Sequence, residues 1–190
     1  MTPRSPYFDL VRRHYEKFWR DESRVYRWPK GPVHELPEQF GMLEFRPRPG
    51  RRMWTYATCG MSAVDDKRPL ELHLFSLSQS MDLVELLTIV THFHRTGESL
   101  WLGHTVNFGR PWLKGSLCTF GLISLPYLDG PDLQNARIMD QENETQFLWL
   151  IPVTPGEVAY KQKYGLDALE TLFEKTGFDY IDPMRRDSVG

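Results

Sequence analysis

One short apolar run near the end of the chain restricts the fold more than any other feature. Residues 145–153 read TQFLWLIPV, and Phe147–Ile151 is apolar without interruption. An unbroken run of this length is typical of a strand that is covered on both faces of a sheet. A helix start follows at once, because Thr154 suits an N-cap, Pro155 the first helical position and Glu157 the third. The sequence therefore predicts a buried strand that leads directly into a helix.

Three further helices are predicted from apolar side chains at helical spacing. The clearest is Met81–Thr96, in which Asp82 is the expected N-cap and Glu85 occupies the capping-box position. Gly97 is expected to end this helix in a left-handed conformation. The other two helices are expected over Pro6–Arg20 and over Asp167–Lys175, the latter closed by Gly177.

Extended segments account for much of the remaining chain. Leu70–Leu77 alternates, with leucines on one face and Glu71 and His73 on the other. Further strands are expected over Gly41–Arg46, Arg51–Cys59, Trp101–Phe108 and Ser116–Leu125, the first two as a hairpin and the last two separated by the Gly109-Arg110-Pro111 turn. This order of elements predicts the α+β class, with one domain over residues 1–190 and a mixed, largely antiparallel sheet flanked by helices.

Length, charge and cysteine usage limit the kind of molecule. The 190 residues suit one domain with its own core, and a net charge of −2 argues against a general nucleic-acid binder, which needs a dominant basic face. A membrane role is not expected, because the Phe147–Ile151 run is far too short to cross a bilayer. No continuous apolar stretch of a signal peptide is evident, and Cys59 and Cys118 lack metal-binding spacing. We therefore expect a cytoplasmic protein with free thiols.

Two loops carry local charge of opposite sign. The basic loop holds Arg46, Arg48, Arg51 and Arg52, and the acidic loop holds Asp140, Glu142 and Glu144. A solvated hairpin loop is the expectation for the arginines, and a patch for an acidic partner is the alternative. The acidic loop could instead face a basic partner.

The block from Leu102 to Pro131 combines glycines, prolines and large aromatic residues between short apolar runs. Trp, Tyr and Arg dominate the energetics of protein interfaces, so the Arg110-Pro111-Trp112 turn and the Tyr127–Pro131 turn are candidate contacts. For the tryptophans as a group, packing in the core is the default expectation and an interface is the alternative. If the intervening strands pair as a hairpin, the two turns would be neighbours. The predicted partner-binding residues are His104, Asn107, Arg110, Trp112, Tyr127 and Asp129.

Enzymatic motifs are weak in this chain. His92 and His94 could ligate a metal together with His104, but residues two apart on a helix point about 200° apart. Both could reach one ion only where the helix end unwinds. Cys118 could pair with His104 as nucleophile and base, although nothing local activates the thiol. We predict no catalytic residue, no cofactor and no metal.

Five short motifs follow one another in a fixed order. They are Trp54-Thr-Tyr56 with Gly60-Met61-Ser62, Glu71-Leu-His-Leu74, a helix ending near His92-Phe-His94, Gly103-His-Thr-Val-Asn-Phe108, and Asp182-Pro-Met-Arg-Arg186. This set resembles the Suppressor of fused domain family over residues 52–189. The animal proteins of the family carry an additional C-terminal domain, so the chain is most similar to the stand-alone bacterial members.

The resemblance implies a non-enzymatic, protein-binding role. Animal members bind and restrain a Hedgehog-pathway transcription factor, and stand-alone bacterial members are associated with polymorphic toxin systems. We therefore expect a bacterial immunity protein that neutralises a toxin by occupying its surface. A regulator that sequesters an endogenous protein such as a transcription factor is the alternative, and a metal-dependent hydrolase using His92, His94 and His104 is the alternative from a different class. The animal proteins have an acidic residue where His104 follows Gly103, so their partner chemistry is not carried over to this segment.

Overall fold

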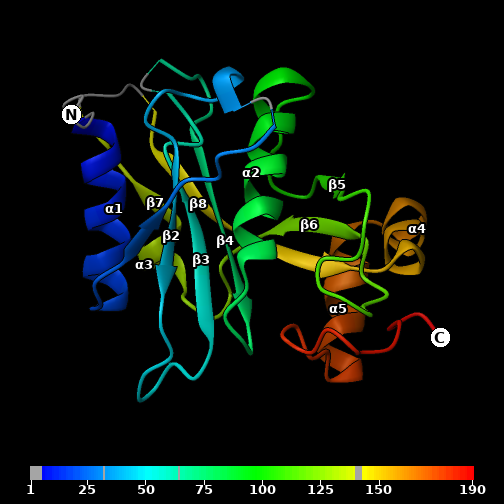
Figure 1. Cartoon of the computed structure of the whole chain (residues 1–190). Helices are drawn as coiled ribbons and strands as arrows, with labels where there is room; N and C mark the ends of the chain where they lie inside the picture. The colour runs from blue at the N-terminus through cyan, green and yellow to red at the C-terminus, as the bar shows by residue number, and fades with distance from the viewer. Residues whose placement is uncertain (1–5, 32, 64, 140–142) are drawn as a thin grey trace.

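The computed structural model describes residues 6–31, 33–63, 65–139 and 143–190. Its strands are β1 (Arg24–Tyr26), β2 (Gly41–Phe45), β3 (Trp54–Cys59), β4 (Leu70–Ser76), β5 (Thr105–Asn107), β6 (Phe120–Ser124), β7 (Asn135–Ala136) and β8 (Thr145–Val153). They form one sheet in the order β1-β2-β3-β4-β8-β6-β5, with β7 also paired to β8. All pairs are antiparallel except β4 with β8. The predicted α+β class and mixed, largely antiparallel sheet are confirmed (Figure 1).

Helices cover both faces of this sheet. They are α1 (Pro6–Trp19), η1 (Val33–Glu35, a 3-10 turn), α2 (Met81–Thr96), α3 (Pro131–Gln134), α4 (Pro155–Tyr164) and α5 (Leu166–Thr176). Because side chains alternate along β8, Leu148 and Leu150 pack in the core under α2, whereas Phe147 packs with α1 and Trp149 with α5. Figure 1 shows α1 and α2 on opposite sides of the central strands.

The two central strands are buried along nearly their whole length. In β8 every residue except Gln146 is buried, which confirms the predicted coverage of both faces. All of β4 is buried as well. Its leucines lie on one face of the sheet and Glu71 and His73 on the other, and both faces are covered. Glu71 accepts hydrogen bonds from Thr58 Oγ1 at 2.6 Å and from the Gly60 N–H at 3.0 Å, while burial raises its pKa to about 7.

Helix ends agree with the sequence at α4 and α5 but differ at α2. Thr154 and Glu157 form the predicted capping box, and Gly177 closes α5 with a left-handed φ of 64°. The N-cap of α2 is Ser80 and not Asp82, because the Ser80 hydroxyl accepts the Asp82 N–H. The predicted left-handed Gly97 is also wrong, since its φ is −110°.

Strands β5 and β6 are shorter than predicted, and their connection is a packed loop. The three-residue turn expected at Gly109–Pro111 is wrong, because residues 108–119 all lie between the two strands. Phe108 and Trp112 are buried in the core, and the Trp112 N–H donates to the Cys118 carbonyl at 3.0 Å. Burial of these two rings holds the loop against the sheet. The predicted β2–β3 hairpin is confirmed.

Two sequence expectations concern membranes and the acidic loop. Among the described residues, no helix is long and apolar enough to cross a membrane. Asp140 and Glu142 of the acidic loop lie outside the described residues, and Glu144 is exposed.

Candidate functional site

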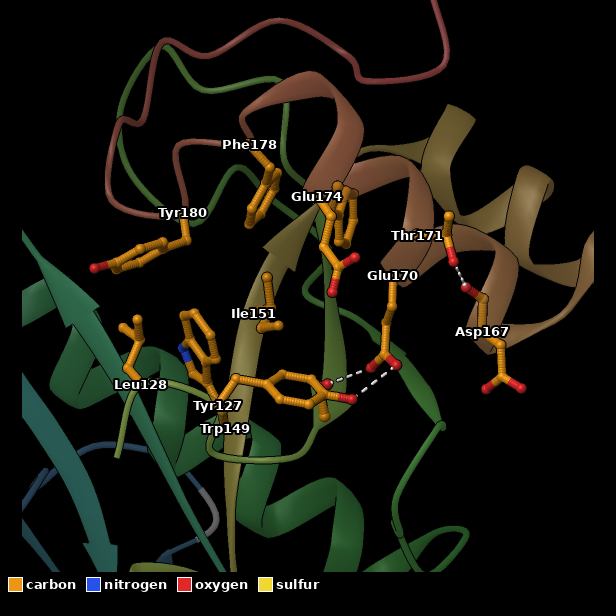
Figure 2. A pocket seen from close by; sticks show the side chains of 12 residues that line it. Tyr127, Leu128, Trp149, Ile151, Asp167, Glu170, Thr171, Glu174, Phe178 and Tyr180 are labelled. Atoms are coloured by element: carbon orange, nitrogen blue, oxygen red, sulfur yellow. Dashed lines mark hydrogen bonds between the residues drawn. The ribbon is translucent and has the colours of Figure 1, made fainter. Parts of the chain in front are cut away.

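An open hollow lies between α5, the end of β6 and the C-terminal segment. It has a volume of about 460 Å³ and is open to solvent. Its aromatic lining residues are Tyr127, Trp149, Phe173, Phe178 and Tyr180, its aliphatic ones Leu128 and Ile151, and its polar ones Ser124, Asp167, Glu170, Thr171 and Glu174. We call it the α5 cavity. Figure 2 shows these side chains converging from four separate parts of the chain.

The floor and the acidic wall of the α5 cavity follow from simple periodicities. Trp149 and Ile151 stand two positions apart on β8, so both point to the face covered by α5. On α5, Glu170 and Glu174 are one turn apart and share a helix face. Figure 2 shows both carboxylates on the cavity side of the helix, whereas the Asp167 carboxylate points away from the aromatic side chains.

Glu170 is held by two hydroxyl donors. Ser124 Oγ donates to Oε1 at 2.6 Å, and the Tyr127 hydroxyl donates to Oε2 at 2.9 Å. Burial, and next the hydrogen bond to Glu170, raise the pKa of Tyr127 to about 12. The phenol therefore stays protonated at neutral pH and keeps donating. Tyr127 and Leu128 are 58% and 47% exposed, so the loop that closes one side of the cavity also presents apolar surface to solvent.

The opposite wall belongs to the C-terminal segment. The Tyr180 ring meets Trp149 edge-on with centroids 5.0 Å apart, and Phe178 stacks on Phe173 at 4.1 Å. The Arg185 guanidinium lies 4.4 Å from the Phe178 ring centroid. Arg185 also donates from both terminal nitrogens to Glu157, each at 2.6 Å, in a buried ion pair. The Asp182–Arg186 motif therefore fastens this aromatic wall to the start of α4.

Asp129, one of the predicted partner contacts, is a buried structural residue. Its side chain is only 2% exposed and accepts hydrogen bonds from Trp19 Nε1 at 2.9 Å and from Arg51 Nη1 at 2.7 Å. His73 Nε2 lies 3.5 Å from its other oxygen, and complete burial lowers the His73 pKa to about 4. The expectation that Arg51 belongs to a solvated loop is wrong, because its guanidinium group pairs with the buried Asp129 carboxylate.

Arg110 and Trp112 do not form the exposed loop tip that the sequence suggested. Trp112 is 1% exposed, and its Nε1 donates to Ser116 Oγ at 2.9 Å. Arg110 is half-buried and pairs with Glu85 of α2 at 2.9 Å. The predicted neighbourhood of this turn and the Tyr127 turn is also wrong. The first precedes β6 and the second follows it, so they lie at opposite ends of one strand.

The remaining predicted residues and the histidines are dispersed. His104 and Asn107 are exposed beside or within the edge strand β5, and neither lines the α5 cavity. His92 contacts Glu35 of the 3-10 turn, whereas His94 is buried and its Nδ1 accepts the Leu100 N–H at 2.9 Å. Within the described part of the chain, no three His, Cys, Asp or Glu side chains are grouped so that they could hold a metal ion.

Of the predicted partner contacts, only Tyr127 lines the α5 cavity. The other residues that line the cavity were not predicted as site residues from the sequence. Trp149 was expected in the core, and it is indeed mostly buried, but its ring also forms the cavity floor. The acidic spacing of Glu170 and Glu174 was a usable signal, since carboxylates one turn apart on an amphipathic helix mark one face. The position of Tyr180 depends on tertiary contacts of an irregular segment, and no local pattern reveals it.

Comparison with protein families decides the classification. A family model described as Suppressor of fused protein (SUFU) matches residues 37–186. The chain belongs to the Suppressor of fused family. The match begins before Arg52, the first residue of the resemblance found from the motifs. Membership in this family is consistent with a non-enzymatic protein-binding domain.

Solved structures of Suppressor of fused proteins have the same fold. A crystal structure of a SUFU homolog from Neisseria gonorrhoeae has 28% identity and a TM-score of 0.84, and the match covers 97% of each chain. The crystal structure of a Sufu–Fu complex has 12% identity and a TM-score of 0.69, over 98% of this chain and 93% of that one. Drosophila Suppressor of Fused has 14% identity and a TM-score of 0.64, over 96% of this chain and 51% of that one. No curated protein matches the chain.

Proposed function

We propose that this Suppressor of fused domain acts by binding a protein partner at the α5 cavity and the adjoining Tyr127–Leu128 surface. The observation that carries the proposal is an open, aromatic-lined cavity beside two exposed apolar side chains, on a loop that is hydrogen-bonded to α5 and α1. Large rings in a preformed hollow are typical of interface hot spots, because they bury much area at a small entropic cost. One of the similar structures is a complex of Sufu with Fu, which supports a protein as the class of partner.

More specifically, we propose that the chain is a bacterial immunity protein that acts in the cytoplasm. Binding would neutralise a toxin sterically, by covering the surface that the toxin needs, without any turnover of substrate. The acidic wall of the cavity supports a basic partner surface, as many nucleases present to their substrate. The alternative partner, an endogenous regulated protein, would use the same contacts.

Roles for the predicted contact residues follow from their positions. Tyr127 would touch the partner directly, because more than half of its surface is exposed at the cavity mouth. Asp129 and Trp112 would act only by holding loops in place, since both side chains are buried. For His104 and Asn107, a partner contact at the edge strand β5 stays a prediction. For Arg110, a partner contact beside α2 stays a prediction.

Co-expression with the products of neighbouring genes tests the immunity role. A toxin encoded beside this gene should stop growth when expressed alone, and the wild-type chain should restore growth. Tyr127→Ala with Leu128→Ala should lose most protection, whereas Ile89→Ala on α2, at the opposite face of the sheet, should retain it. Restoration by the double variant at equal protein level would contradict the assigned surface. Association without any effect on toxicity would favour the regulatory alternative.

A further inference from the structure

The α5 cavity combines aromatic walls with negative charge that has no cationic partner. Glu170 and Glu174 face the hollow, and neither forms an ion pair within 4.0 Å among the described residues. No Lys, Arg or His is among the residues that line the cavity. Nearby cations are committed elsewhere, since Arg185 is paired with Glu157 and Arg51 with Asp129. The field inside the hollow is therefore negative.

The ring faces add to this field. Aromatic rings carry negative charge density on their faces, and they attract a cation within about 6 Å of the centroid. Trp149 is only 5% exposed and forms the cavity floor, whereas the Tyr180 ring is partly exposed in one wall. Ring surface and the α5 carboxylates therefore border the same hollow. Other arginines of this chain already use the same chemistry; for example, Arg51 lies 4.6 Å from the Trp19 ring and Arg185 lies 4.4 Å from the Phe178 ring.

The acidic wall is also fixed in position before any ligand arrives. Both Glu170 oxygens accept hydroxyl groups, from Ser124 and from Tyr127, and each carboxylate oxygen can accept a second bond. Neutral hydroxyl donors orient the carboxylate without cancelling its charge. Glu174, one turn further along α5, is exposed and forms no hydrogen bond or ion pair with the described residues. A ligand cation therefore meets one oriented carboxylate and one free carboxylate.

From this arrangement we propose that the α5 cavity is a receptor for an arginine side chain of the partner protein. The inference rests on the proposed protein-binding function and names the partner chemistry: a basic, exposed segment whose arginine enters the hollow. The planar guanidinium group stacks on the Tyr180 ring, above the Trp149 floor, and donates from its edge to Glu170 and Glu174. An acidic segment is repelled by the two carboxylates, and a purely apolar one leaves them dehydrated without a partner.

Arginine fits this site better than lysine for physical reasons. Its guanidinium is planar and weakly hydrated, so it can stack on a ring and bind carboxylates at once. A lysine ammonium group is strongly hydrated; it can pair with the carboxylates, but it has no planar face to stack on an aromatic ring. The cavity of about 460 Å³ has room for one such side chain and part of its flanking backbone.

The test uses the capped tripeptide acetyl-Gly-Arg-Gly-amide titrated into the full chain by ¹H–¹⁵N NMR. Isolated contacts of this size give dissociation constants on the order of 1 mM. Amide signals of Trp149, Glu170, Glu174 and Tyr180 should shift together, and the affinity should fall with added salt. The same tripeptide with citrulline, the neutral isostere of arginine, should bind at least about fivefold more weakly.

Matched charge variants complete the test. Glu174→Gln should weaken the arginine tripeptide about threefold, whereas Glu98→Gln, an exposed glutamate after α2, should leave its affinity unchanged. Equal binding of the citrulline peptide, equal effects of the two variants, or shifts located elsewhere would overturn the inference. If the arginine tripeptide fails while the chain still neutralises its partner through Tyr127 and Leu128, the receptor chemistry is wrong and the proposed function stands. If the tripeptide binds but no partner depends on this surface, the proposed function fails instead.

Discussion

The Tyr127 hydroxyl group donates a hydrogen bond of 2.9 Å to Glu170 Oε2, which joins the loop after β6 to a helix 43 positions later. Two residues further on, Asp129 accepts hydrogen bonds from Trp19 in α1 and from Arg51 in the β2–β3 hairpin. One short turn therefore connects three parts of the molecule. This connection explains how a loop with exposed apolar side chains keeps a fixed position beside the α5 cavity.

Removing the phenol hydroxyl isolates the first of these connections. Tyr127→Phe should lower the free energy of unfolding by about 0.5–1 kcal/mol, because one hydrogen bond to a charged but partly hydrated group is lost. Urea denaturation measures this change. Tyr164→Phe is the matched control, since Tyr164 is similarly exposed and no hydrogen bond of its hydroxyl is found within the described residues. Equal losses in both variants would show that the Glu170 contact does not stabilise the fold.

Trp112 and Arg110 should differ sharply in their effect on stability. Trp112→Ala removes a fully buried ring and should cost about 3–5 kcal/mol, which lowers the melting temperature by many degrees. Arg110→Ala removes a half-exposed ion pair with Glu85 and should cost less than about 1 kcal/mol. Thermal unfolding followed by circular dichroism distinguishes the two variants. A near-native melting temperature for Trp112→Ala would contradict its burial and revive the view of an exposed contact.

The order of elements was predictable from local patterns, whereas the site was not. The periodicity of Met81–Thr96, the capping box at Thr154 and the apolar run of β8 each depend on neighbours in sequence, and each prediction was confirmed. Trp112 and Asp129 were assigned to a surface because their turns look solvent-exposed in sequence. Their burial depends on partners such as Trp19, 110 positions from Asp129, which local patterns cannot show.

Acid should destabilise the protein partly through His73. Burial lowers the folded-state pKa of His73 to about 4 from the usual 6.5, so the unfolded chain binds more protons between those values. The free energy of unfolding therefore rises with pH between about 4 and 6.5, and the contribution of His73 to it is lost as the pH falls through this window. His94, with a pKa lowered to about 4, acts in the same direction, whereas Glu71, raised to about 7, opposes both above pH 4.5.

Substitution separates the His73 contribution from the others. His73→Gln should reduce the slope of stability against pH between 4.5 and 6.5 by at most about 1.4 kcal/mol per pH unit, the value for one proton. Urea titrations at several pH values give this slope. His34→Gln, at an exposed position, should leave the slope unchanged. An unchanged slope in His73→Gln would mean that His73 is protonated in the folded protein near its ordinary pKa.

The aromatic wall of the cavity should depend on the forked geometry of Arg185. Lysine cannot donate from two nitrogens to Glu157, so Arg185→Lys should cost about 2–3 kcal/mol and speed hydrogen exchange in residues 178–189. Arg186→Lys, at an exposed position, should change neither quantity. Wild-type exchange rates in Arg185→Lys would show that the charge alone holds this segment.

Site-specific photo-crosslinking in the native cell tests the central claim most directly. A photoreactive amino acid replaces Leu128, which is 47% exposed at the cavity mouth, or Ile89, which is 42% exposed on α2 at the other face of the sheet. We predict one dominant protein adduct from position 128, with a lower yield when Glu174→Gln is combined with it, and no such adduct from position 89. The same adduct from position 89, or none from position 128, would contradict binding at the α5 cavity.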